Sequence, residues 1–332
     1  MLEYVIRRIL WAVVLFIGIT VVTFILFFVA PHAPERLVCG GQQAKPACMR
    51  NAVERLGLDQ PIYVQYGLFL KRIVVDRSLG TSFITRQSVN HLVGKAAPVT
   101  ASLVLGGMVM WLLVGLLVGI LTAVRARSLT DRAAMVLVLL GISAHPVWIA
   151  LIFSYVFGYK LRNFPLHTPI GGYADFFNPP PGSPGGPVEW FYHLLLPWVT
   201  FAILYGALYA RMIRANILET LDEDFVRTAR AKGAPEARVL RAHVLRNALL
   251  PAVTMLSMDI GLALGGAIFT ETIFNLPGLG WLSLDAVRSN DLTVIEGVIV
   301  FATLAIVVFN LLVDILYAWV DPRIRLTTPG IA

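Results

Sequence analysis

The chain has 332 residues, of which 57% are hydrophobic and only 14% are charged, and its mean hydropathy is +0.74. A soluble domain carries about 25% charged residues, so this composition excludes an ordinary soluble domain and predicts a protein embedded in a membrane. The formal net charge of +7 fits basic loops on the cytoplasmic side of a membrane. The sequence has no run of basic and aromatic residues typical of a nucleic-acid surface.

Six apolar segments are candidates to cross about 30 Å of hydrocarbon. Their predicted ranges are residues 10–30, 99–124, 133–159, 194–210, 249–268 and 293–320. The first segment is either a retained anchor or the apolar part of a cleaved signal peptide, and its length favours the anchor because signal-peptide cores run to about 7–15 residues. Pro146 predicts a kink in the third segment.

The distribution of basic residues predicts the orientation of these segments. Arg7 and Arg8 precede the first segment, and the two short loops predicted to lie outside, residues 160–193 and 270–292, hold only three basic residues. Because cytoplasmic loops are enriched in Lys and Arg, both termini are predicted to be cytoplasmic.

Residues 31–98 are polar and predicted to lie outside the cytoplasm. They hold nine Lys or Arg residues, which long translocated segments tolerate. Cys39 and Cys48, the two cysteines of the chain, are predicted either to form a disulfide in this oxidising location or to remain free thiols.

One stretch between the fourth and fifth apolar segments, residues 219–250, is rich in charged residues, and eight positions from Arg211 to Arg246 are Lys or Arg. Thr220 with Glu223 three residues later predicts a capping box at a helix start. Gly233 predicts the end of that helix, because glycine readily takes the left-handed conformation that ends many helices, and Pro235 suits the first turn of a second helix. The stretch therefore predicts a helix, a glycine turn and a second basic helix, an arrangement suited to contacting a partner.

Ionisable residues inside apolar segments are rare and often functional. His145 and Asp259 lie deep in their segments and are candidates to line a polar pathway. Glu296 and Asp314 lie near the ends of the sixth segment and are interpreted as interfacial. The glycine pairs 115/119 and 261/265 have the small-xxx-small spacing that allows close helix packing, which suggests that the second and fifth segments pack tightly.

Catalytic motifs are absent from the sequence. Gly94-Lys95 lacks the first glycine and the Ser/Thr of a phosphate-binding loop, and neither HExxH nor GxSxG occurs. Cysteine and histidine residues show no metal-ligand spacing. The chain is therefore predicted not to be an enzyme and to hold no metal.

Several stretches resemble the inner-membrane permease subunit of bacterial ABC importers, in the peptide/nickel branch that contains the dipeptide- and oligopeptide-type "B" permeases. The matching stretches are RLGLDQPIYVQY (55–66), DRSLGTS (76–82), APVTASL (97–103), ETIFNLPGLG (271–280), VDILY (313–317) and DPR (321–323). In the coupling motif of the wider family, EAA-x3-G, Gly233 matches the glycine and Ala229 the second alanine. Arg227 and Thr228 depart from that motif, whereas ARAKG at 229–233 is typical of the branch.

The resemblance implies an all-α membrane protein with six transmembrane helices of the ABC importer type I permease class. It implies a first helix at 1–30, an extracytoplasmic segment at 31–98, a five-helix core at 99–320 with coupling helices at about 220–247, and a cytoplasmic tail at 321–332. ATPase coupling would use Arg227, Thr228, Ala229, Arg230, Ala231, Lys232, Gly233, Ala234 and Pro235. The outer gate or the docking of a binding protein would use Glu271, Phe274, Pro277, Gly278, Leu279 and Gly280.

The same resemblance implies four kinds of partner: a homologous permease, two ATP-binding subunits, an extracytoplasmic substrate-binding protein and membrane lipid. ATP and magnesium would bind the ATPase subunits, and this chain would hold no cofactor. The expected substrates are di- and oligopeptides. The open alternatives are a nickel-chelate, glutathione or haem importer of the same branch, or a secondary transporter, although the sequence lacks the internal repeat that many of these show.

Overall fold

The structure is a computed structural model. It describes residues 2–29, 35–36, 39, 46–82, 84–161, 168–169, 171–177 and 185–320. Within these ranges the regular secondary structure is helical, with an isolated bridge between Thr81 and Ser88. The predicted all-α fold is therefore confirmed for the described residues, whereas the predicted tail 321–332 lies outside them.

In the described chain, four helices are long and apolar enough to cross a membrane as single elements. These candidate spans are Ile6–Val29, Val89–Val124, Pro187–Leu221 and Leu292–Val313. Two bent pairs of helices bring the number to six if each pair forms one span: Leu129–Ser143 with Pro146–Lys160, and Glu236–Leu256 with Met258–Ile273. The upper number agrees with the six predicted segments.

Some helices extend beyond the predicted apolar ranges. The second span begins at Val89 rather than at residue 99, and the fourth covers Pro187–Leu221 rather than 194–210. Apolar content marks only the part of a helix that matches hydrocarbon, and the added turns are more polar, so hydropathy did not reveal them. The predicted outer loop 270–292 is also largely helical, because α12 (Leu250–Ile273) continues into it and α13 (Leu279–Ser289) follows.

The predicted kink in the third segment is a full break. The helix α6 (Leu129–Ser143) meets the helical segment Pro146–Lys160, which begins with α7 (Pro146–Phe153), at 101°. Ala144 and His145 between them are extended, as expected for the residue that precedes a proline. The His145 Nδ1 accepts a hydrogen bond from the Val147 N–H at 3.3 Å, so this histidine caps α7.

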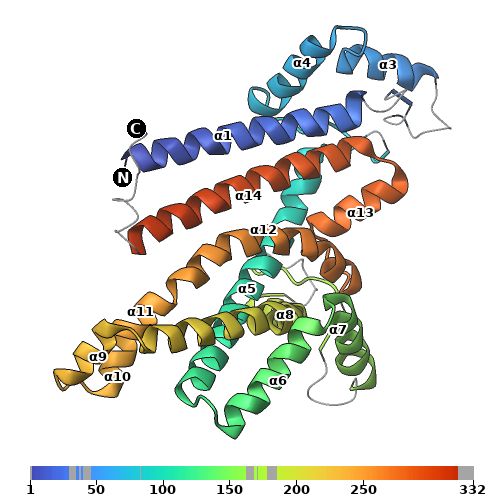
Figure 1. Ribbon diagram of the computed structural model, residues 1–332. Coiled ribbons are helices and arrows are strands. Elements are labelled where there is room, and N and C mark those ends of the chain that lie inside the picture. The colour runs from blue at the N-terminus through green and yellow to red at the C-terminus, as the bar shows by residue number, and fades with distance from the viewer. Residues whose placement is uncertain are drawn as a thin grey trace. The chain divides into compact units, whose positions relative to one another are not determined.

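The described residues divide into two compact units. The first comprises Met1–Thr100 and Pro277–Ala318, and Figure 1 shows α1 and α14 running side by side within it. Its elements are α1 (Leu2–Phe24), η1 (Ile25–Val29), α3 (Pro46–Leu56), α4 (Ile62–Val74), the start of α5 (Val89–Val124), α13 and α14 (Leu292–Val320). Phe24, Phe69 and Val300 form a buried cluster that joins α1, α4 and α14.

The second unit comprises Ala101–Leu276. Its elements are the rest of α5, α6, α7, η3 (Ser154–Lys160), α8 (Pro187–Leu221), α9 (Asp224–Ala231), α10 (Glu236–Arg238), η4 (Val239–Val244), α11 (Leu245–Ala248) and α12. A Cβ added at Gly115 would lie 2.6 Å from the Cβ of Tyr209, and one at Gly119 would lie 3.0 Å from the Ala210 carbonyl oxygen. The second span therefore packs closely on the fourth rather than on the fifth, where Gly265 faces open space.

Candidate functional site

The segment that links α8 to α12 begins later than the capping-box pattern predicts. Thr220 still belongs to α8, and its hydroxyl donates to the Asn216 carbonyl at 2.7 Å. The next helix, α9, starts at Asp224, and its N-cap Glu223 makes no side-chain capping bond. The predicted capping box is therefore wrong, because a threonine inside a helix can bond the carbonyl four residues back instead.

The turn at Gly233 is as predicted and can be described bond by bond. Gly233 has φ +79°. Its N–H donates to the Arg230 carbonyl at 2.9 Å, and the Ala234 N–H donates to the Ala229 carbonyl at 3.2 Å. These two bonds form a Schellman motif, which satisfies carbonyls at a helix end and favours glycine at the left-handed position.

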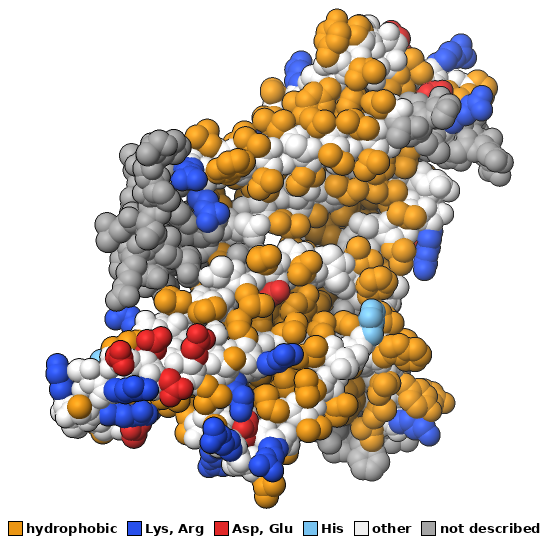
Figure 2. Space-filling view, viewed as in Figure 1, with side chains coloured by type: hydrophobic (Ala, Val, Ile, Leu, Met, Phe, Trp, Pro, Cys, Tyr) orange, Lys and Arg blue, Asp and Glu red, His pale blue; other side chains and the backbone are white. Residues whose placement is uncertain are grey.

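The segment has a buried inner face and an exposed outer face. Val226, Val239 and Val244 are fully buried, so α9 and η4 pack by their apolar sides. Asn216 of α8 donates a side-chain hydrogen bond to the Ala248 carbonyl at 3.2 Å, which ties the returning chain to α8. Figure 2 shows basic and acidic side chains gathered where Figure 1 draws α9 and α10.

The exposed face of α9 combines charge with an aromatic ring. The outward residues of α9 and of the Lys232 that follows it are Asp224, Phe225, Arg227, Thr228, Arg230, Ala231 and Lys232, and the Phe225 side chain is 42% exposed. Arg230 makes a bidentate pair with Glu236 across the glycine turn, at 2.9 and 3.3 Å. Arg230 therefore braces the turn, whereas Arg227 and Lys232 remain outward-facing basic groups, with Arg227 only 3.8 Å from the exposed carboxylate of Asp224.

A second feature near this segment was not predicted from the sequence. Arg214 of α8 donates two hydrogen bonds to Asp131 of α6, at 2.8 and 2.9 Å. The Arg127 N–H donates to the same carboxylate at 2.9 Å, and the Asp131 side chain is only 5% exposed. This pair fixes α6 against the part of α8 that leads to α9. In the sequence, Asp131 is a single aspartate within a basic loop, and nothing in the sequence pattern identified Arg214 as its partner.

The two predicted pathway residues differ in their surroundings. Asp259 of α12 is buried, and the Tyr209 hydroxyl of α8 donates to its Oδ2 at 2.8 Å. His145 is exposed and caps α7. No hydrogen bond joins His145 to Asp259 among the residues that the structure describes, so a shared polar pathway has no support from these contacts.

The first unit contains its own buried charge pair. Arg72 of α4 pairs with Glu296 of α14, whose side chain is 8% exposed. Ser82 donates to Asp291, also within this unit. The interfacial interpretation of Glu296 missed this pairing, because its partner lies 224 residues away. The side chain of Asp314 lies outside the described residues.

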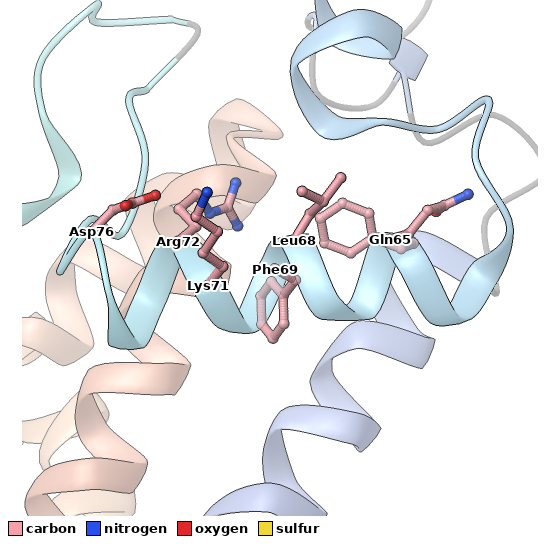
Figure 3. A pocket seen from close by; sticks show the side chains of 7 residues that line it. Gln65, Leu68, Phe69, Lys71, Arg72 and Asp76 are labelled. Carbon is pink, nitrogen blue, oxygen red and sulfur yellow. The ribbon is translucent and has the colours of Figure 1, made fainter.

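Arg72 also lines a cavity of about 210 Å³ beside α4. Figure 3 shows Lys71, Arg72, Leu68 and Gln65 on one side of this helix. The full lining is Phe28, Gln65, Leu68, Phe69, Lys71, Arg72 and Asp76. The guanidinium carbon of Arg72 lies 5.6 Å from the centre of the Phe69 ring, so the arginine is held by both an ion pair and an aromatic face.

The predicted outer segment 271–280 is mostly buried. Glu271 and Phe274 in the second unit are 0% and 1% exposed, and the Gly172 N–H donates to the Phe274 carbonyl at 3.1 Å. In the first unit, the Leu279 N–H donates to the Thr100 hydroxyl at 2.8 Å. Gly278, Leu279 and Gly280 are buried, whereas Pro277 is exposed. The gate and docking roles stay predictions, and Pro277 is the member best placed to meet a partner.

Of the two cysteines, only Cys39 has a described side chain. Cys39 is disulfide-bonded. The side chain of Cys48 lies outside the described residues, so its pairing with Cys39 stays a prediction.

Comparison with known proteins covers almost the whole chain. The family described as binding-protein-dependent transport system inner membrane component matches residues 115–326, and its N-terminal counterpart matches residues 1–104. The chain is 35% identical over 335 residues to the dipeptide transport system permease protein DppB of Alkalihalophilus pseudofirmus, covering 98% of this chain and 100% of that protein. It is 37% identical over 339 residues to the di/tripeptide transport system permease protein DppB of Pseudomonas aeruginosa, covering 98% and 99%.

A solved structure of an amino acid ABC transporter with histidines is also similar. The match has a TM-score of 0.47 and 17% identity, and it covers 70% of this chain and 94% of that chain.

Proposed function

Because the chain belongs to the family of inner membrane components of binding-protein-dependent transport systems, we propose that it is the permease subunit of an ATP-driven importer of di- and oligopeptides. Relatives that match over nearly their full length are named as dipeptide and di/tripeptide permeases, which supports peptides as the substrate. ATP hydrolysis takes place in partner subunits, and this chain supplies half of the transport route together with a homologous permease. A substrate-binding protein delivers the peptide from outside.

The single observation that carries the coupling role is the geometry of α9. An exposed, basic and partly aromatic helix lies between two membrane-crossing elements, and the glycine turn after it is fixed by two backbone hydrogen bonds. Such a helix fits a groove on an ATPase subunit, in the way that amphipathic helices are commonly recognised. With both termini cytoplasmic, as the basic residues predict, α9 lies on the side where ATP is available.

Movement of α9 has a path into the membrane part of the chain. Its buried face packs within the segment, Asn216 ties that segment to α8, and Arg214 ties α8 to α6. A displacement imposed on α9 by closure of the ATPase pair is therefore passed to at least two spans as a rigid-body motion. Opening and closing of the route then follow from a shift between two packed arrangements.

A substitution at Gly233 tests this role. Gly233→Val places a β-branched side chain at φ +79°, a conformation that strongly disfavours such residues. Gly233→Asn is the matched control because asparagine tolerates left-handed backbone. No heavy atom lies within 4 Å of an added Cβ, so backbone strain is the main difference between the two variants. We expect Gly233→Val to stay in the membrane but to lose peptide uptake, whereas Gly233→Asn keeps most of it.

Uptake of radiolabelled dipeptide into cells measures the result, with membrane content checked by immunoblot. Wild-type uptake by Gly233→Val would remove the turn from the coupling mechanism. A second variant tests the contact surface itself. Phe225→Asp alters an exposed side chain on α9 and is expected to reduce co-purification of the ATPase subunits. Leu129→Asp, at a residue 83% exposed on α6, serves as the control and is expected to leave co-purification unchanged.

Pro277 offers a test of the outer face. A photo-reactive amino acid at this exposed position is expected to cross-link the substrate-binding protein when the complete transporter is assembled. The same probe at the buried Leu279 is expected to give no such product. Absence of cross-links from Pro277 in an actively importing complex would exclude docking at this segment.

A further inference from the structure

Asp259 stands at the edge of an exposed face of α12. Its own side chain is buried, at 8% exposure, but Met258 before it is 70% exposed and Leu262 one turn later is 66% exposed. The exposed positions recur at helical spacing along α12: Pro251, Thr254, Met258, Leu262, Gly265 and Phe269. Gly265 and Gly266 leave open space where other residues carry side chains. The helix therefore presents a smooth apolar stripe with one carboxylate beside it.

The carboxylate is held rigidly from behind. Tyr209 is fully buried, and its hydroxyl donates to Asp259 Oδ2 at 2.8 Å. Gly115 of α5 lies directly against the Tyr209 Cβ position, so the tyrosine has little freedom to move. Tyr205, one turn before Tyr209 on α8, packs its ring against the Trp111 ring of α5 with the ring centres 4.7 Å apart. Tyr209 thus fixes the orientation of Oδ2.

The charge of Asp259 has no counter-ion in the described part of the chain. Tyr209 is its sole hydrogen-bond partner there, and neither an arginine nor a lysine pairs with it. A carboxylate within an apolar span is unfavourable unless it meets a cation or faces a polar route. The bond from Tyr209 occupies one oxygen and leaves the lone pairs of Oδ1 for another donor.

We propose that Asp259 recognises the α-ammonium group of a peptide as it passes through the transport route, an inference that rests on the proposed import of peptides. Every unmodified peptide carries this group at neutral pH, so one carboxylate provides a contact that does not depend on side-chain sequence. An ammonium group has three donors and no acceptor, which matches a carboxylate oxygen that is free to accept. The apolar stripe of α12 contacts the rest of the peptide without specific bonds, as a carrier of varied peptides requires.

Reconstitution of the complete transporter, with its partner permease, ATPase subunits and binding protein, tests this assignment. The probe is trialanine at a concentration that saturates the binding protein, and the readout is the rate of ATP-dependent uptake into proteoliposomes. Asp259→Asn keeps an oxygen that accepts the Tyr209 hydroxyl but removes the charge. We expect this variant to reduce the maximal uptake rate about tenfold or more, as loss of one charge-assisted hydrogen bond would, with little change in the half-saturating concentration. Asp259→Glu keeps the charge and is expected to stay within about threefold of wild type.

Two further variants separate recognition from packing. Leu137→Met changes a 69% exposed apolar side chain of α6, outside the α12 stripe, without altering charge and is expected to import at the wild-type rate. Tyr209→Phe removes the hydroxyl that orients the carboxylate and is expected to fall between wild type and Asp259→Asn. For N-acetyl-trialanine, which lacks the ammonium group, Asp259→Asn and wild type are expected to import at equal rates.

The outcomes that would overturn the assignment are specific. Wild-type uptake of trialanine by Asp259→Asn would show that the charge is not used and would overturn the assignment. Loss of the partner permease from the purified Asp259→Asn complex would instead assign the carboxylate to the subunit interface. Failure of the wild-type complex to import trialanine would reject the proposed function itself, whichever variant is used.

Discussion

The Asp131–Arg214 pair gives the strongest single prediction from the contacts of the chain. Asp131 accepts two hydrogen bonds from Arg214 and one from the Arg127 N–H, and its side chain is 5% exposed. Removing one partner of a fully buried ion pair costs about 3–5 kcal/mol, because the remaining charge is left without compensation. The Arg214 side chain is 25% exposed, so water compensates part of its charge. We therefore expect Asp131→Ala to lower the free energy of unfolding by about 3 kcal/mol, roughly a hundredfold in the folding equilibrium.

A double-mutant cycle measures the pair without the penalty of the orphaned charge. The variants are Asp131→Ala, Arg214→Ala and the combination, each unfolded with denaturant in detergent micelles. We expect a coupling energy of about 2 kcal/mol, within the range for residues in direct contact. Arg227→Ala is the control because its contact with Asp224 is long and fully solvated, and it is expected to leave stability unchanged. A coupling energy indistinguishable from zero would refute the role of this pair in fixing α6 to α8.

Three further predictions follow from other contacts. Arg72→Met leaves the Glu296 carboxylate buried without a counter-ion and is expected to lower the unfolding temperature sharply. Combining Arg72→Met with Glu296→Gln removes that buried charge and is expected to recover much of the lost unfolding temperature. Thermal denaturation in detergent compares the two variants. Gly115→Val inserts side-chain atoms where a Cβ would already lie 2.6 Å from a side chain of α8 and is expected to cost about 1–3 kcal/mol, whereas Gly265→Val meets open space and is expected to be neutral in the same denaturant assay. Asn216→Ala removes the hydrogen bond to the returning chain and is expected to reduce the rate of peptide uptake by a larger factor than it reduces the folding equilibrium constant. Equal factors for uptake and folding would contradict that expectation.

Composition and local chemistry were sufficient for the coarse architecture. The apolar segments predicted six crossings, and the described residues contain four single candidate spans and two bent pairs that could each form one span. The short motifs predicted the permease family, which the matches over residues 1–104 and 115–326 confirm. Gly233 was identified because the left-handed end of a helix depends on a few consecutive residues and is therefore a local property.

Contacts between distant residues could not be predicted in the same way. Arg214 is 83 residues from Asp131, and Arg72 is 224 residues from Glu296. A charged residue in the sequence does not indicate which opposite charge the fold will bring to it, since the chain offers many oppositely charged residues for each one. The buried position of Glu296 was missed for this reason. Glu296 lies near the end of an apolar segment, which suggested an interfacial side chain.

The threonine at the end of α8 shows how two local rules compete. Thr220 and Glu223 have the spacing of a capping box, yet Thr220 stays inside α8 and donates to the Asn216 carbonyl. The same α8 turn contains the Asn216 side chain, whose amide donates to the Ala248 carbonyl. The last full turn of α8 therefore carries both bonds, one within the helix and one to the returning chain. Because the Thr220 hydroxyl bonds a carbonyl of its own helix, it does not cap the next one, and α9 starts at Asp224 rather than directly after Thr220.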